Sequence, residues 1–404
     1  MKAIDIEKGK VRLKNRHLFT DLNAYDYKWE LYKNGTLIVS KPVMIKGKPL
    51  TETDITLSLP EFDIHKGEEY FLRLKAFTRT ATDLVPAGHE VVAEDFAFPE
   101  NQFFASSHPQ GQLKVTQAGT DLRFESGDVE GQISLTNGTL THYAFKGQRL
   151  LASAPVPNFW RAPTDNDFGY MQQNSANIWR NAGDHPDIKK VEVKPQAAEG
   201  VEVVVTALIR YLNIPYTLSY LVRNDGSVKV CANINMKGIA HPEPSRFGMK
   251  MSIPKMFEHV NYYGRGPWEN YNDRNRSALV GNYSAKVKDL GFDYIRPQEN
   301  GYRTDVRTVS FTDDSGFGVR FEGFDAPICF NARYNPDEDF DPGLTKKQQH
   351  PVDITPHLNG IYVNIDLKQL GVGGDDSWGK HPMKHYRMLD DVYDYSYVIK
   401  PAIR

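Results

Sequence analysis

The alternation of apolar and polar residues at every second position constrains the fold of this chain more than any other feature. Apolar residues follow this period over the segments 55–59, 70–76, 216–222, 228–236 and 361–367. Successive side chains of a β-strand point to opposite faces of its sheet, so each segment predicts a strand with one buried face. Helical patterns are few, and the best short candidate is 175–182.

Tight-turn dipeptides separate the predicted strands. Asn34-Gly35, Asn137-Gly138 and Asp225-Gly226 are typical of two-residue β-hairpins, because both turn positions favour residues that accept a positive φ. The last of them joins the segments 216–222 and 228–236. We therefore expect an all-β fold built from antiparallel sheets.

A domain boundary is predicted near 99–112. Pro99 follows a strand end, and the stretch 106–111 is polar, turn-forming and poor in apolar residues. About seven strands in roughly 100 residues precede it, which is the size of an immunoglobulin-like sandwich. The chain beyond it, roughly 300 residues, has no comparable linker. We expect it to form one large double-sheet domain.

Composition excludes several classes of function. The 404 residues carry a formal net charge of −2, so the chain has no basic surplus for nucleic acid or an anionic membrane. Two cysteines, Cys231 and Cys329, cannot form a disulfide framework and lack the Cys-x-x-Cys spacing of a metal site, and the 12 histidines are scattered apart from one His-x-x-x-His pair at His381 and His385. No apolar run could span a bilayer, and the N-terminus lacks the apolar core of a signal peptide. We expect a soluble protein, cytoplasmic or periplasmic according to what precedes Met1 in the natural protein.

Residues 371–378, Gly-Val-Gly-Gly-Asp-Asp-Ser-Trp, are the part of the chain most like a binding site. The glycines at 371, 373 and 374 permit backbone angles that a Cβ would forbid. Asp375 and Asp376 can accept hydrogen bonds from nearby amides and hold a tight loop. Such a loop would present Trp378, whose flat face suits a sugar ring. The structural alternative is that Trp378 plugs the edge of a β core, as large aromatic residues often do.

Three further segments combine arginine, carboxylate and amide side chains with aromatic residues: 158–169, 263–274 and 296–303. Sugar-binding clefts use these residue types, and so do the internal ion pairs that hold long loops in a large sandwich. The run 165–167, Asp-Asn-Asp, lacks the ligand spacing and terminal glutamate of a calcium loop.

No catalytic residue is predicted within this chain. Adjacent Asp375 and Asp376 cannot face each other across a substrate, as the two carboxylates of a glycosidase must. Glu269 and Glu299 could meet in space, but the sequence gives no sign that they do.

These segments, in this order and spacing, resemble the C-terminal part of the multidomain β-galactosidases of glycoside hydrolase family 2. The matching runs are 161–167, 264–271, 297–301 and 373–378, with weaker matches at 15–19 and 87–89. The resemblance implies an immunoglobulin-like β-sandwich at 1–105 and a large β-supersandwich, like that of galactose mutarotases, at 110–404. It also implies that Trp378, beside Asp375 and Asp376, contributes to substrate binding.

The resemblance implies a fragment or small subunit of an enzyme that hydrolyses terminal β-D-galactosides with retention. The catalytic glutamates of that family lie on a (β/α)₈ barrel, and nothing in this chain looks like one. The expected partners are β-galactoside sugars and the missing barrel domain or large subunit, and a homo-oligomer is a candidate assembly. We expect no cofactor in this chain, and leave metal ions open for the complete enzyme.

Two other functions stay open on sequence grounds. A free-standing aldose mutarotase or sugar epimerase would need a histidine acid and a glutamate base, for which His259, His350, His357 and Glu299 are available. A non-catalytic carbohydrate-binding module would differ mainly in having no catalytic partner.

Overall fold

The chain folds into two compact units in a computed structural model that describes residues 1–104, 109–195, 197–346, 349–376 and 378–403. Unit 1 comprises Met1–Ala105 with Leu279–Asn282, and unit 2 comprises Ser106–Ala278 with Tyr283–Arg404. Part of the predicted boundary at 99–112, residues 105–108, lies outside the described residues.

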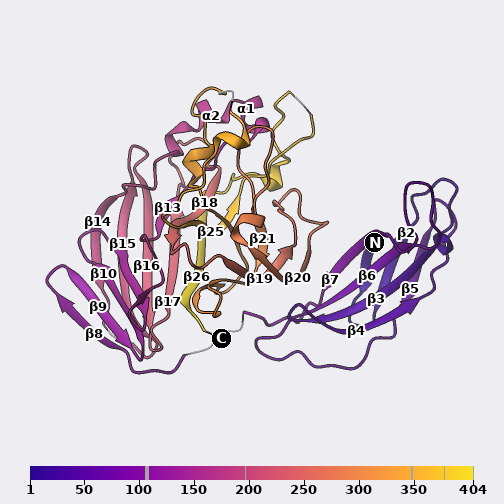
Figure 1. Ribbon diagram of the computed structural model, residues 1–404, viewed down its shortest axis with the longest axis horizontal. Helices are drawn as coiled ribbons and strands as arrows, with labels where there is room; N and C mark the ends of the chain where they lie inside the picture. Colours follow the sequence, from indigo (N-terminus) through magenta and orange to yellow (C-terminus); the bar gives the residue numbers. More distant parts are fainter. Residues whose placement is uncertain (105–108, 196, 347–348, 377, 404) are drawn as a thin grey trace. The chain divides into compact units, whose positions relative to one another are not determined.

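Unit 1 contains two antiparallel sheets (Figure 1). In spatial order they are β1 (Lys2–Asp5), β2 (Lys10–Lys14) and β5 (Glu52–Thr56), then β4 (Thr36–Val43), β3 (Tyr25–Lys33), β6 (Tyr70–Thr78) and β7 (Glu90–Ala97), with a 3-10 turn at Leu22–Ala24. Val11 from the smaller sheet and Trp29, Leu31 and Leu72 from the larger one share a single buried core. The expected seven-stranded sandwich is confirmed.

Unit 2 contains three sheets, again with antiparallel neighbours. The first, in spatial order, is β12 (Gln148–Arg149), β11 (Thr139–Phe145), β10 (Val129–Ser134), β9 (Asp121–Ser126) and β8 (Lys114–Ala118). The second is β13 (Val156–Asn158), β18 (Arg246–Ile253), β25 (Ile361–Gln369), β24 (Ile328–Arg333) and β21 (Arg303–Val306). The third is β14 (Asp187–Val193), β15 (Gly200–Ile209), β16 (Ile214–Arg223), β17 (Val228–Asn235), β26 (Val392–Ala402), β23 (Gly318–Gly323), β22 (Thr308–Thr312), β19 (His259–Gly266) and β20 (Leu279–Lys286).

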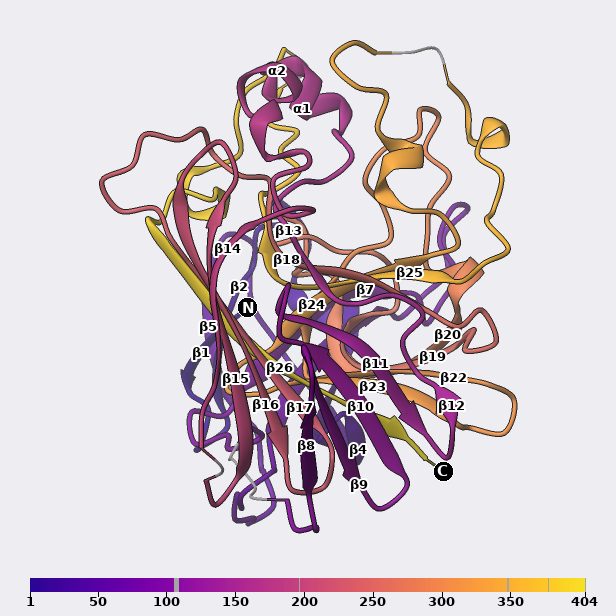
Figure 2. The ribbon, with the colours of Figure 1, turned by 90° about the vertical axis from the view of Figure 1, so that its left-hand side faces the viewer.

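Both five-stranded sheets of unit 2 pack on one face of the nine-stranded sheet. The turn at Gly138, between β10 and β11, lies against the side chain of Val205 on β15. The ring of Phe247 on β18 packs edge-to-face on Tyr395 of β26, with centroids 5.6 Å apart. Val205 and Tyr395 belong to the same alternating buried set, so one continuous core fills unit 2. Figure 2 shows β8–β10 crossing in front of the long strands β16 and β17.

The three predicted hairpins are present, but only the first has a two-residue connection, since 135–138 and 224–227 form the other two. Asn34-Gly35 joins β3 to β4, the turn ending at Gly138 joins β10 to β11, and the turn containing Gly226 joins β16 to β17. Both residues of the first pair have positive φ, 47° for Asn34 and 74° for Gly35, as the turn chemistry predicts.

The predicted helix at 175–182 is wrong. Short helices instead span α1 (Asp165–Gly169) and α2 (Gln172–Ser175), followed by a 3-10 turn at Asn177–Trp179. Met171, between the helices, takes the left-handed conformation, and Trp179 turns inward to be buried. Further 3-10 turns occur at Val287–Asp289, Asp337–Phe340, Pro351–Asp353 and Lys384–Tyr386. Among the helices of the described ranges, none has the length and apolar character to cross a membrane.

The prediction of one buried face per strand holds for β17 but fails for β6 and β25. β17 alternates between buried and partly exposed residues along its length. Five consecutive residues of β6 are buried, and β25 buries Asn364 and Asp366 as well as its apolar face. The polar face of β25 is buried because charged side chains from neighbouring strands and loops cover it, as described below.

Candidate functional site

Trp378 lies on the loop that follows β25 and is 86% exposed. An indole this exposed is not part of the core, so the alternative of a core plug is wrong. The loop lies near α1, since Asn166 Nδ2 donates to Val372 O over 2.8 Å. Figures 1 and 2 show α1 and α2 together at one end of unit 2.

Local hydrogen bonds hold the turn that carries Trp378. Asp376 Oδ1 accepts from the backbone amides of Trp378, at 2.9 Å, and Lys380, at 3.1 Å. These amide contacts hold the pKa of Asp376 below its usual value. Asp375 does not act in the same way, because its carboxylate lies 3.7 Å from Lys380 Nζ in an exposed ion pair. Ser377 lies outside the described residues.

The glycines of this loop serve two different purposes. Gly373 and Gly374 have φ values of 70° and 109°, which confirms the expected need for glycine. Gly371 does not need a positive φ, so that expectation is wrong for this position. Its requirement is space, since a Cβ there would lie 2.6 Å from Asp273 Oδ2.

Asp273 fixes the start of the loop. Its two carboxylate oxygens accept from the backbone amides of Val372, at 3.1 Å, and Gly373, at 2.8 Å. The neighbouring Asn272 donates from Nδ2 to Gln369 O over 2.9 Å. Two segments predicted separately from the sequence, 263–274 and 371–378, are therefore joined by hydrogen bonds.

Arg161 supports the same loop from within the protein. Its Nε and Nη2 donate to the two oxygens of Asp167 over 3.0 and 2.8 Å, and both side chains are buried. It also donates to the carbonyl oxygens of Leu370 and Gly371, the latter at 3.1 Å. Burial opposes the charged form of the guanidinium, but the Asp167 carboxylate outweighs it and raises the pKa of Arg161. The arginine is thus an internal anchor for the loop.

On its other side the loop contacts the end of α1 through two glycines. A Cβ on Gly169 would lie 2.8 Å from Gly379 Cα, and a Cβ on Gly379 would lie 2.2 Å from the carbonyl of Gly169. Gly379 also has a φ of 98°. Any side chain at either position would therefore separate the loop from the helix.

The outer face of the sheet that contains β25 carries a buried charged cluster. Arg246 Nη2 donates to Glu299 Oε2 over 3.1 Å, Arg246 Nη1 donates to Asp337 over 2.7 Å, and Arg246 Nε lies 3.1 Å from Asp366 Oδ2. Asn331 completes the binding of Glu299, donating to Oε1 over 2.7 Å. Sequence reasoning missed this cluster apart from Glu299. The reason is that polar residues alternate with apolar ones on β25, which predicts that the polar side of this strand faces solvent.

Desolvation dominates the titration of Asp366. Its burial, with Glu299 and Asp337 nearby, raises its pKa to about 7, and the attraction of Arg246 only partly opposes this. Asp337 behaves in the opposite way, because Arg246 and Arg333 outweigh its burial and lower its pKa. The same cluster therefore shifts the pKa values of Asp366 and Asp337 in opposite directions.

The two glutamates considered for catalysis have separate structural roles. Glu269 accepts from the Gly301 amide, at 2.8 Å, and pairs with Arg274. Glu299 is fully buried within the charged cluster. Of the three histidines considered for an epimerase, His259 pairs with Asp314 and His357 with Asp339. His350 caps the 3-10 turn at Pro351–Asp353, where its backbone amide donates to Asp353 Oδ2 over 2.8 Å, so none of these contacts includes Glu299. This geometry does not assemble the acid and base that an epimerase needs.

Metal ligation finds no support in the described ranges, where no group of three or more His, Cys, Asp or Glu residues could hold an ion. Asp165, from the predicted Asp-Asn-Asp run, instead pairs with Arg296 and Lys346. Both cysteines are free thiols.

Comparison with known proteins identifies the class to which this fold and loop belong. A family model described as "Beta galactosidase small chain" matches residues 125–399, and one described as "Beta-galactosidase, domain 4" matches residues 11–99. The chain belongs to the β-galactosidase small-chain family, in which it corresponds to a C-terminal portion of a multidomain β-galactosidase.

Curated relatives agree along the whole chain. A β-galactosidase of Priestia megaterium is 33% identical, over 99% of this chain and 38% of the relative. Others from Halalkalibacterium halodurans and Streptococcus thermophilus are 29% and 24% identical, over 96% and 98% of the chain. This chain spans about 38% of the length of each of these relatives.

Solved structures give only distant matches. A putative aldose 1-epimerase from Escherichia coli K12 has a TM-score of 0.37 at 11% identity, covering 72% of this chain and 99% of that protein. A galactose 1-epimerase from Lactobacillus acidophilus has a TM-score of 0.35 at 9% identity, covering 73% and 99%.

Proposed function

We propose that the complete protein is a glycosidase that hydrolyses terminal β-D-galactosides with retention of configuration, and that this chain completes its galactose-binding cleft. The relatives that match the whole chain are named β-galactosidases, and each has more than half its length outside the match. In this proposal the catalytic carboxylates belong to a barrel domain or large subunit, because Glu269 and Glu299 are bound within the fold.

The observation that carries the proposed role of this chain is the display of Trp378. Placing a large apolar ring in water is unfavourable unless a ligand or another protein surface covers it. Here the indole is 86% exposed, while the loop beneath it is fixed by Asp273 and Arg161. In this proposal Trp378 stacks on the galactose ring, and Asp375 and Asp376 shape the turn beside it. The chain itself holds no cofactor in this scheme, and metal ions or homo-oligomer contacts belong to the complete enzyme.

Activity measurements on the separate and complete proteins test the proposal. The purified chain should not hydrolyse an activated aryl β-galactoside, whereas the complete protein should, with the anomeric configuration of the first product retained when followed by NMR. Turnover by the chain alone that is abolished by Glu269→Gln or Glu299→Gln would contradict the proposal. An inactive complete protein would contradict it equally.

A further inference from the structure

A pocket of about 490 Å³ in unit 2 has the composition of a sugar site. It lies between the loops 287–300 and 351–356 and the end of β24. The aromatic residues of its lining are Phe292, Tyr294, Tyr334 and Phe340, and its polar residues include Gln298, Asn300, Arg333 and Asn335. A volume of this size suits one or two sugar rings.

The polar lining is built into the fold before any ligand arrives. Gln298, Asn300, Arg333 and Asn335 are each at least nine-tenths buried. Asn335 Nδ2 donates to Asp339 Oδ2, at 2.7 Å, and to Thr355 O, at 2.8 Å, so both of its amide hydrogens are used within the protein. This arrangement leaves its side-chain oxygen to accept a hydroxyl group.

Arg333 supplies the complementary donor. Its Nη1 donates to Asn300 O over 3.4 Å, and its Nη2 bonds Asp337, which leaves the Nε hydrogen for a ligand oxygen. The guanidinium stacks on the ring of Phe340, 4.7 Å from its centroid, and this contact fixes its plane. Arg333 and Arg246 share Asp337, and Arg246 also pairs with Glu299 and Asp366, so the two arginines face three carboxyls. Because this cluster leaves no positive surplus, the pocket favours a neutral ligand over an anion.

The aromatic walls are held in place as well. Tyr294 OH bonds Glu269, and Tyr334 OH donates to Glu258 Oε2 over 3.1 Å. Phe292 packs on Tyr294 with centroids 4.8 Å apart but remains 59% exposed. An exposed ring beside preorganised polar groups is the arrangement by which proteins bind the apolar face of a sugar.

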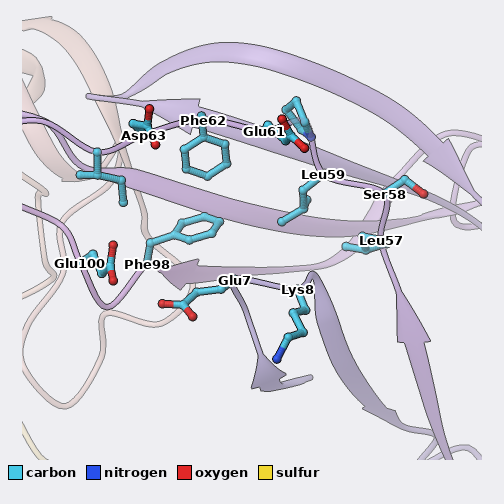
Figure 3. Close-up of a pocket in the computed structure, with 12 residues that line it drawn as sticks. Glu7, Lys8, Leu57, Ser58, Leu59, Glu61, Phe62, Asp63, Phe98 and Glu100 are labelled. Atoms are coloured by element: carbon cyan, nitrogen blue, oxygen red, sulfur yellow. The ribbon is translucent and has the colours of Figure 1, made fainter.

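A groove in unit 1 provides an instructive contrast (Figure 3). It is larger, at about 980 Å³, and its apolar floor is formed by Phe62 and Phe98. Its charged lining residues, Glu7, Lys8, Glu61, Asp63 and Glu100, are all exposed. Solvated, mobile side chains do not preorganise hydrogen bonds, so the unit 1 groove lacks the feature that distinguishes the pocket in unit 2.

We propose that the pocket lined by Phe292, Arg333, Asn335 and Phe340 binds one hexopyranose ring of a neutral saccharide. The ring stacks against the aromatic wall while Asn335 and Arg333 provide an acceptor and a donor for its hydroxyl groups. Trp378 does not line this pocket, so the inference is independent of the role proposed for that residue.

Lactose titration of the isolated chain tests this site, with all variants made in a Trp378→Ala background so that stacking on Trp378 cannot contribute. Calorimetry and saturation-transfer NMR should show saturable binding with a Kd on the order of millimolar. Phe292→Ala should weaken it by about tenfold, since an aromatic contact is worth about 1 kcal/mol. Tyr211→Ala, which removes an aromatic ring that is more exposed than Phe292 (81% against 59%) from the turn between β15 and β16, should leave the Kd unchanged.

Two results would overturn the proposal. One is the absence of saturation by lactose up to about 100 mM, and the other is equal affinity of the Phe292→Ala and Tyr211→Ala variants for lactose. Phe340→Leu keeps most of the buried volume of the side chain but removes its ring. If the melting temperature of this variant is unchanged, its lactose affinity should fall as that of Phe292→Ala does.

Discussion

The carboxylate of Asp273 accepts a hydrogen bond from the backbone amide of Gly373 over 2.8 Å, linking positions 100 residues apart in the chain. The same side chain holds the amide of Val372. Asp273 therefore holds the start of the Trp378 loop through its amides, while Arg161 holds it through the carbonyls of Leu370 and Gly371.

Asp273→Ala should loosen that loop. It leaves two amides without their acceptor, each at a cost of about 1–3 kcal/mol if it is not rehydrated. Trypsin should then cut after Lys380 faster than in the unmodified chain. Asp314→Ala, which removes an exposed carboxylate elsewhere in unit 2, is the matched control and should not change the rate. Equal cleavage rates in all three proteins would show that Asp273 does not hold the loop.

Trp378→Ala should impair binding in the complete enzyme rather than stability. We expect KM to rise roughly tenfold or more, because an aromatic contact is worth about 1 kcal/mol or somewhat above, and Trp378→Phe should recover part of the loss. The melting temperature of the isolated chain should not change, since the indole is largely exposed. Normal kinetics in the alanine variant would contradict the proposed stacking.

Arg161→Met should destabilise unit 2 severely, by about 3–5 kcal/mol, because it leaves the buried Asp167 carboxylate without its partner. Arg161→Lys should not restore stability, since an ammonium group cannot reproduce the paired contacts of a guanidinium. Lys189→Met breaks an exposed ion pair with Asp187 in the same unit and should change urea unfolding little. Comparable losses of stability in Arg161→Met and Lys189→Met would show that burial of the ion pair is not the cause.

Asp366→Asn should change how stability depends on pH. In the native protein the pKa of Asp366 is raised to about 7 from an ordinary 3.8, so between these values the folded state binds a proton that the unfolded state has lost. This group therefore stabilises the fold fully below about pH 4 and loses that contribution as the pH rises to about 7. The Asp366→Asn variant has no carboxyl at this position, so it does not lose this stability as the pH rises.

The measurement is the difference in urea midpoint between the Asp366→Asn variant and the unmodified chain. The urea midpoint of the variant should rise relative to that of the unmodified chain from pH 4 to pH 7, and the difference should remain constant above that range. A difference independent of pH would mean that Asp366 is ionised throughout.

Sequence periodicity located β6, β16, β17 and β25, whereas the predicted segment 55–59 overlaps β5 only at residues 55 and 56. Val228 to Ile234 alternate in the sequence as they do in β17. Periodicity failed at β25, where Asn364 and Asp366 appear to be solvent-facing but lie beneath Arg246 and Asp337. Residues far away in the chain contact that face, such as Arg246 at Asp366 and Asn158 at Asn364, and no local pattern records such contacts.

The sequence predicted which residues form the candidate site, but not the separate role of each one. The glycines and carboxylates of 371–378 indicated a fixed loop displaying Trp378, and the loop does display it. The sequence could not show that Asp375 and Asp376 act differently, because adjacent identical residues give no sign of which one faces the backbone amides. Nor could it show that Arg161 faces inward, since an arginine suits a cleft and a buried ion pair equally.

The contact of Gly169 with Gly379 has a consequence for engineering this family. Because the two backbones fit only when both lack side chains, the helix end and the loop form a matched pair rather than independent modules. A chimera that takes the 371–379 loop from a relative must take residues 165–169 as well. In a library that varies Gly379 alone, most variants would displace the loop from the helix, and the Trp378 indole would move with it.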